Sequence, residues 1–137
     1  MKATGSSIVI ICLCLFSFTL SIIAARVVDF PISGSEESRD FASNLVADIA
    51  PSLIISIERC GLTEGGMYRN WKGKDISDFN ARIDYLFIDH PKTVGIGDGG
   101  NEIGMGNLAD EIKTVPSLAS DPCITECVNL INSSVSN

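Results

Sequence analysis

A glycine-rich run at residues 95–106 constrains this chain more than any other segment, because it suits neither a regular helix nor a regular strand. Six of its twelve residues, in the order GIGDGGNEIGMG, are glycine. Each glycine loses more backbone freedom on folding than other residues do. Such a density is useful where a loop needs positive φ angles or brings its N–H groups close to an anion. We therefore expect a tight, functional loop here.

Two acids, Asp98 and Glu102, stand four residues apart within this run. Together they could bind a divalent cation, exchange protons or hold an ammonium group. The sequence requires no cofactor and leaves these three uses open. Gly95, Gly97 and Gly100 also satisfy the GxGxxG pattern of dinucleotide sites. Two further glycines nearby disfavour the helix that such a site needs, so we discount a dinucleotide.

The rest of the chain alternates predicted strands with predicted helices, which indicates an α/β fold with a mostly parallel sheet. We expect three layers and about four strands, forming an incomplete part of a larger domain. The apolar run at residues 53–57 predicts a strand buried on both faces. The expected strands cover residues 27–30, 53–57, 93–96 and 124–131; the expected helices run from an N-cap at Ser33 or Ser35 to Pro51, over 76–87 and over 108–115.

The first 25 residues differ from the rest, since residues 8–25 are almost wholly apolar. With Lys2 before them and Ala24 and Ala25 after them, they resemble a secretory signal peptide. An uncleaved membrane anchor is the alternative, because 18 apolar residues approach the length that spans a bilayer. A third reading is an erroneous start with no biological meaning. The domain boundaries are therefore 1–25 for the leader and 26–137 for the folded part.

Charge and cysteine content limit the partners. The formal net charge is −7, and it becomes −8 when residues 1–25, whose only charge is Lys2, are removed. An acidic chain with no basic stripe is a poor candidate for nucleic acid, and membrane contact is expected only through residues 8–25. Cys60, Cys123 and Cys127 are an odd number of thiols outside the leader, so we expect free cysteines and no metal site built from them.

Polar residues follow the predicted strands, at the edge where ligands bind in open α/β sheets. Arg59 could clamp a substrate carboxylate or pair with an acid such as Glu58, and the sequence leaves both open. Asn132 begins a glycosylation sequon that is meaningful only if the leader is real. The polar strand-end residues are Asp29, Glu58, Arg59, Asp98, Ser136 and Asn137.

The run TVGIGDGGNEIGMG at residues 93–106 closely resembles the signature of the D-glutamate cyclase C-terminal domain family. The similarity extends back through residues 57–59, Asn70, residues 72–77 and Asp84, and forward to residues 134–137. It covers roughly residues 27–137. Cys60 stands where the family has proline, and the family domain is much longer than this chain.

This resemblance implies a hydro-lyase that closes D-glutamate to 5-oxo-D-proline and water, in a protein that is mitochondrial in animals. The alternative is an inactive truncated paralogue, or a remnant that binds a small carboxylate. We expect Arg59 to hold the α-carboxylate, the loop N–H groups to stabilise the oxyanion, and Asp98 or Glu102 to transfer protons. The candidate substrate-binding residues are Glu58, Arg59, Gly97, Gly99, Gly100 and Asn101.

Overall fold

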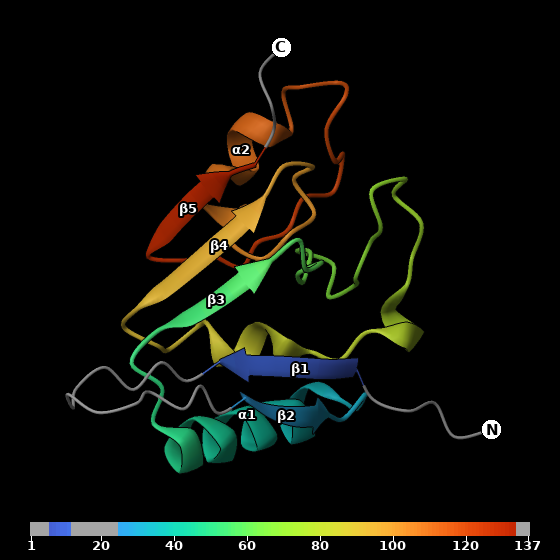
Figure 1. Cartoon of the computed structure of the whole chain (residues 1–137). Coiled ribbons are helices and arrows are strands. Elements are labelled where there is room, and N and C mark those ends of the chain that lie inside the picture. The colour runs from blue at the N-terminus through green and yellow to red at the C-terminus, as the bar shows by residue number, and fades with distance from the viewer. Residues whose placement is uncertain (1–5, 12–24, 134–137) are drawn as a thin grey trace.

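The computed structural model of the chain describes residues 6–11 and 25–133. Its centre is a parallel sheet of three strands, β3 (Ile54–Ile57), β4 (Thr93–Gly97) and β5 (Asn129–Asn132), in the order β3-β4-β5. Figure 1 shows the three arrows side by side, pointing the same way. The predicted α/β class with a parallel sheet is confirmed. The last strand begins to pair with β4 at Asn129, five residues later than expected. Residues 124–128 form a loop instead, in which Glu126 pairs with Gly104 and Met105.

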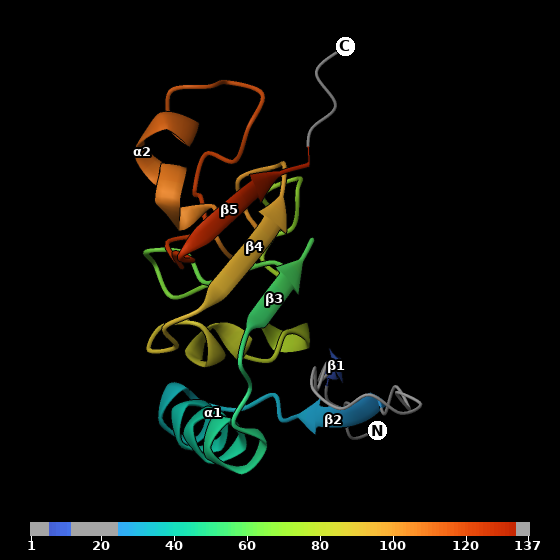
Figure 2. The same cartoon turned by 60° about the vertical axis from the view of Figure 1, so that its left-hand side comes forward.

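Only one face of this sheet is covered within the described residues. Because β3, β4 and β5 follow one another in both sequence and space, two right-handed crossovers place both connections on the same face. The opposite face carries Ile55, Ile57 and Ile131, which are 52%, 68% and 52% exposed. The expectation that residues 53–57 form a strand buried on both faces was therefore wrong. A third layer over that face is absent from the part of the chain described here (Figure 2).

The first two strands form a separate antiparallel sheet, with β1 (Ser6–Ile11) paired to β2 (Ala25–Phe30). A strand was predicted at residues 27–30, but it does not join the parallel sheet. We had expected Asp29 at the carboxyl edge of the parallel sheet. It lies instead in β2, which belongs to the antiparallel sheet. β1 falls inside the predicted leader, whose remaining residues, 1–5 and 12–24, lie outside the described residues. No helix in the described residues is long and apolar enough to cross a membrane.

Helix α1 (Ser35–Ile49) forms where it was predicted and ends at Ala50, whose φ of 47° takes the chain out of the helix before Pro51. Its N-cap is Gly34, without a side-chain cap, because Ser33 bonds Ser38 instead. The prediction of a serine cap was therefore wrong. α1 packs against the turn formed by residues 83–86 and against β2. The core buried there consists of Phe30, Ala42, Leu45, Ala81, Ile83, Leu86, Phe87, Ile103 and Cys127.

The helix expected over residues 76–87 does not form. The chain makes two short 3-10 turns instead, η1 (Ser77–Phe79) and η2 (Ile83–Leu86), separated by an extended residue, Asn80. Phe79 is 75% exposed, so the apolar periodicity in this segment did not mark one buried face. The helix expected over 108–115 is also shorter: a 3-10 turn, η3 (Gly106–Leu108), leads into α2 (Ala109–Ile112).

The break after η1 turns the carboxylate of Asp84 into the protein interior, where this side chain is fully buried. Its Oδ1 accepts the Leu62 N–H at 2.8 Å and the Thr125 hydroxyl at 2.6 Å. Its Oδ2 accepts the hydroxyl of buried Tyr68 at 2.5 Å. One side chain therefore joins the paired residues Leu62 and Tyr68 to Thr125, which is distant in sequence.

We expect Asp84→Asn to lower the free energy of unfolding by about 1–3 kcal/mol. The amide replaces one acceptor oxygen with a donor, so at least one buried donor loses its partner. Urea denaturation followed by circular dichroism measures the change. The control is Asp89→Asn, the same substitution at an exposed position. Equal denaturation midpoints for the two variants would contradict the role given to Asp84.

Candidate functional site

The glycine run folds back over the strand from which it leaves. A Cβ at Gly95 would lie 2.5 Å from the Ile103 carbonyl oxygen, and one at Gly97 would lie 2.7 Å from the Cβ of Glu102. Only glycine allows β4 and the loop to approach so closely. Gly100 and Gly104 have φ angles of 93° and 101°, which other residues rarely adopt. The chain therefore turns back closely over β4 at this segment, with positive φ angles at Gly100 and Gly104.

Backbone hydrogen bonds fix this loop against the residues that follow β3. The Ile103 N–H donates to the Arg59 carbonyl and the Gly61 N–H donates to the Asn101 carbonyl, both at 2.8 Å. Cys60 lies opposite Glu102 in this antiparallel pairing. Residues 58–61 and the glycine loop therefore form one unit at the carboxyl end of the sheet.

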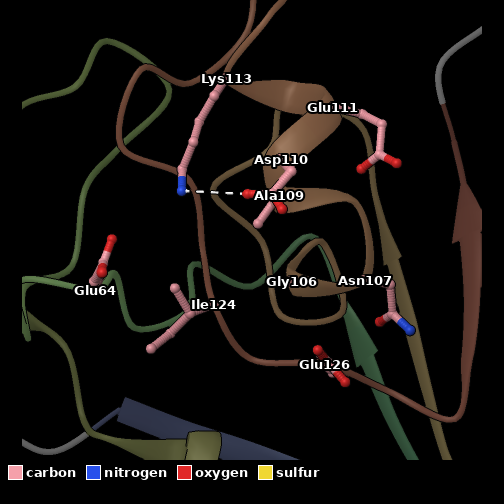
Figure 3. A pocket seen from close by; sticks show the side chains of 9 residues that line it. All are labelled: Glu64, Gly106, Asn107, Ala109, Asp110, Glu111, Lys113, Ile124 and Glu126. Atoms are coloured by element: carbon pink, nitrogen blue, oxygen red, sulfur yellow. Dashed lines mark ion pairs between the residues drawn. The ribbon is translucent and has the colours of Figure 1, made fainter.

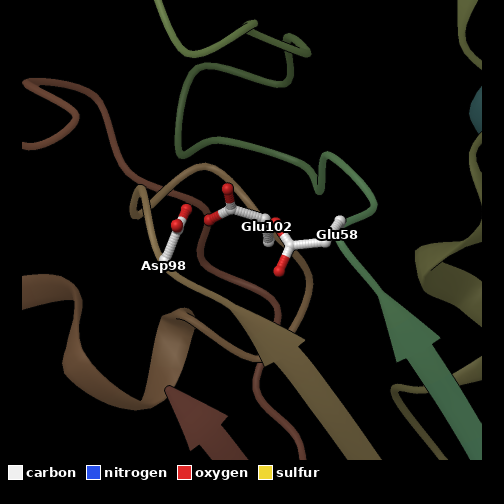
Figure 4. A group of neighbouring side chains, drawn as sticks. All are labelled: Glu58, Asp98 and Glu102. Carbon is white, nitrogen blue, oxygen red and sulfur yellow. The ribbon is translucent and has the colours of Figure 1, made fainter. Parts of the chain in front are cut away.

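Three carboxylates converge in this unit. Oxygens of Glu58, Asp98 and Glu102 all lie within 4.8 Å of one another, and in Figure 4 Glu102 lies between the other two. Glu102 is only 6% exposed, while Glu58 and Asp98 are exposed. Glu58 has a φ of 51°, an uncommon value for a residue with a side chain. The hydroxyl of Ser133 donates to its Oε1 at 2.7 Å.

The Glu102 carboxylate is held by the loop itself. Burial raises its pKa, hydrogen bonds from the backbone oppose the rise, and the charges of Asp98 and Glu58 add to it. The Gly99 N–H lies 3.2 Å from Oε2 and the Gly100 N–H 2.9 Å from the same oxygen. The anion that these N–H groups hold is therefore part of the protein, whereas we had expected a substrate oxyanion.

Asn101 is buried beside this cluster, with 4% of its surface exposed. Its Nδ2 donates to the Cys60 Sγ at 3.2 Å and to the Arg69 carbonyl at 3.1 Å. Its Oδ1 is buried without a hydrogen-bond partner. Burial is the main reason that the pKa of the Cys60 thiol is raised. Cys60, Cys123 and Cys127 are all free, as predicted.

Arg59 does not face the three carboxylates. Its Nη2 donates to the Ala81 carbonyl at 3.3 Å, and its Nε is buried without a partner. The guanidinium is thus directed to the segment between η1 and η2, although Glu58 beside it turns to the cluster. Ser136 and Asn137 lie outside the described residues, and Ser133 is the residue after β5 that contacts the cluster.

A separate depression lies between α2 and residues 124–126 (Figure 3). None of Glu58, Asp98 and Glu102 lines it, and Lys113 pairs there with Asp110 at 3.6 Å. The candidate site is the acidic cluster rather than this depression, because the cluster contains the buried Glu102 whereas no residue that lines the depression is buried. The residues that line the depression are Glu64, Gly106, Asn107, Ala109, Asp110, Glu111, Lys113, Ile124 and Glu126.

The chain is similar to a known protein family. The family described as "D-glutamate cyclase-like, C-terminal" matches residues 6–137. The chain belongs to this family. The match includes residues 6–25, the segment that we had expected to be a leader outside the domain. A similar curated protein is human "D-glutamate cyclase, mitochondrial", 35% identical over 65 residues, which are 44% of this chain and 11% of the human protein.

In this D-glutamate cyclase-like chain, most of the predicted site residues come together. Glu58, Asp98, Glu102, Asn101 and the three predicted loop glycines meet at one edge of the sheet, and Arg59 stands apart. The sequence did not indicate Ser133 as a site residue, because its hydrogen bond to Glu58 depends on the register of β5. It also gave Asp84 no role, although an acid within an otherwise apolar stretch was a signal that could have been used.

We expect Gly95→Ala to lower the free energy of unfolding by about 1–3 kcal/mol, because its methyl group would overlap main-chain atoms of the loop. The matched control is Gly65→Ala, where the closest contact is the flexible end of Met67 at 3.3 Å. The control is expected to change stability by less than about 0.5 kcal/mol. Thermal or urea denaturation measures both, and a stable Gly95→Ala variant would contradict the folding-back of the loop.

Proposed function

We propose that this chain converts D-glutamate to 5-oxo-D-proline and water. Family membership supports a small-molecule substrate, and the human relative is named as a D-glutamate cyclase. The observation that carries the proposal is the convergence of Glu58, Asp98 and Glu102 on the loop whose sequence resembles the family signature. Since the aligned part is 11% of the human protein, the reaction of the whole relative remains a proposal for this chain.

The proposed reaction requires proton transfers from the substrate nitrogen to the departing oxygen. The α-nitrogen of glutamate attacks its own γ-carboxyl carbon, a C–N bond forms and a C–O bond breaks. Two protons leave the nitrogen and end on the departing oxygen, which becomes water. A positioned carboxyl group can carry these protons, and we assign this role to Asp98 or Glu102. Because both reacting groups belong to one molecule, holding the substrate in a folded shape supplies much of the rate.

Substrate binding is assigned to the same edge of the sheet. Glu58 and Asn101, which lie with Asp98 and Glu102 at this edge, are assigned to binding of the substrate. Gly97 and Gly100 are buried against Glu102 and Ile112, so Gly99 is the predicted loop glycine that a substrate can approach. Arg59 would reach the α-carboxylate only by leaving the Ala81 carbonyl, to which it donates now.

The test is incubation of the purified full chain with D-glutamate and with L-glutamate, following 5-oxoproline by chromatography. We expect turnover of D-glutamate, and a loss of about 100-fold or more in Asp98→Asn or Glu102→Gln. The matched control is Asp110→Asn, which changes an exposed acid in the separate depression. Full turnover in both site variants would refute the assignment of the proton carriers.

A second candidate is a non-catalytic protein that binds a small carboxylate. The observation that favours it is the sheet of three strands with one uncovered face, since an enzyme site is normally supported on both sides. Saturable binding of D-glutamate without formation of 5-oxoproline would support this candidate. Turnover by the wild-type chain would exclude it.

We propose further that residues 1–25 direct the chain to the secretory pathway. The named location of the human relative is mitochondrial, so the two compartments are distinguishable outcomes. In the secretory pathway, Asn132 is expected to be glycosylated, because it starts a sequon and its side chain is exposed. A mobility shift with peptide N-glycosidase in the wild type, absent in Asn132→Gln, measures this. Co-fractionation with mitochondria without a shift would contradict the proposal.

A further inference from the structure

The acidic cluster is formed by the carboxyl groups of Glu58, Asp98 and Glu102. Within the described residues, no lysine or arginine forms an ion pair with any of them. One oxygen from each of three carboxyl groups lies within 4.8 Å of the other two. The groups that donate to them from residues 6–11 and 25–133 are neutral: two glycine N–H groups and the Ser133 hydroxyl. Like charges at such distances repel one another unless a cation lies between them.

A second observation points to the same cation. The Asn101 side chain is 4% exposed, yet its Oδ1 has no hydrogen-bond partner. Its Nδ2 is fixed by the Cys60 Sγ and the Arg69 carbonyl, so exchanging the two amide atoms would place an oxygen against that carbonyl. A Cβ at Gly99 would lie 3.0 Å from Asn101 Oδ1 and 3.1 Å from Glu102 Oε1. Both oxygens therefore border the same small space.

From this arrangement we propose that Glu58, Asp98, Glu102 and Asn101 bind a hard divalent cation, of the class of Ca²⁺, Mn²⁺ and Mg²⁺. Carboxylate and amide oxygens are the ligands that these ions take. Calcium–oxygen bonds measure about 2.3–2.6 Å, so an ion at the centre of the cluster is within reach of oxygens up to 4.8 Å apart. Zinc fits less well, because its usual sites contain histidine or thiolate.

The charge of the cluster favours a divalent cation over the ammonium group of a substrate as its occupant. An ammonium would leave two of the three negative charges unbalanced, whereas a divalent ion leaves one. A glutamate substrate also brings two carboxylates of its own, which a metal ion would attract and the bare cluster would repel. Each protein carboxylate keeps a second oxygen for other contacts. The metal site is therefore compatible with the proposed reaction but does not rest on it.

The experiment measures metal binding by the full chain in the absence of any substrate. Protein freed of metal with EDTA and dialysed is titrated with Mn²⁺, followed by the paramagnetic resonance signal of the free ion, and with Ca²⁺ by calorimetry. We expect one ion per chain. Binding is expected to be roughly tenfold or more weaker in Glu58→Gln and in Asp98→Asn. Both variants change exposed side chains and are expected to fold.

Two further variants make the test specific. Gly99→Ala has no positive φ to strain it and puts a methyl group between Asn101 Oδ1 and Glu102 Oε1, so it is expected to weaken Mn²⁺ binding while keeping all three acids. Asp110→Asn removes an acid outside the cluster and is expected to bind as the wild type does. Bound ion should also raise the unfolding temperature of the wild type.

The proposal is overturned if the folded wild-type chain binds neither Mn²⁺ nor Ca²⁺ stoichiometrically, or if the cluster variants bind as well as Asp110→Asn. Binding of D-glutamate that is unaffected by EDTA and lost in Glu58→Gln would also overturn it, since the cluster would then hold an ammonium group. Because these titrations contain no substrate, their failure leaves the proposed reaction open. Failure of the reaction likewise leaves the metal site open.

Discussion

The buried carboxylate of Asp84 is the interaction on which the arrangement of the loops depends. Many of the segments beside the sheet are loops, which backbone hydrogen bonds and isolated bridges connect to one another. Asp84 supplies acceptors for Leu62, Tyr68 and Thr125 at one point. A buried carboxylate is tolerated only when such donors surround it. The same contacts explain why residues 76–87 leave the helical path that their apolar spacing suggested.

The glycine loop depends on this frame in turn. Its return over β4 requires glycine at positions 95 and 97, and its pairing with residues 59–61 requires that the chain after β3 be held in place. The outcome is a set of three like charges beside an unpaired amide oxygen. Such a cluster lowers stability, which is typical of sites that are organised for a ligand rather than for folding.

The uncovered face of the sheet has a topological cause. Sequential strand order with crossovers of one hand puts every connection on one side, and nothing in the described residues packs on Ile55, Ile57 and Ile131. The site does not lie on this face, since Glu58, Asp98 and Glu102 meet at the carboxyl edge.

Several features followed from the sequence alone. The density of glycine fixed the loop at 95–106, because no other backbone suits it, and Pro51 together with an amphipathic stretch fixed α1. The resemblance of residues 93–106 to a known family indicated which residues would form the site. Local composition was sufficient here because turn chemistry and helix periodicity act over a few neighbouring residues.

The tertiary structure decided the rest, because it depends on contacts between distant residues. Whether residues 76–87 form a helix was decided by the donors that meet Asp84 from residues 62, 68 and 125. Whether Arg59 faces the cluster was decided by the position of the Ala81 carbonyl. The sequence alone determined that acids and glycines would share one loop. The order of the predicted strands also placed Glu58 at the same edge. Only the fold directed Arg59 to the Ala81 carbonyl and left the oxygen of Asn101 without a donor, since side-chain contacts and burial are properties of the whole chain.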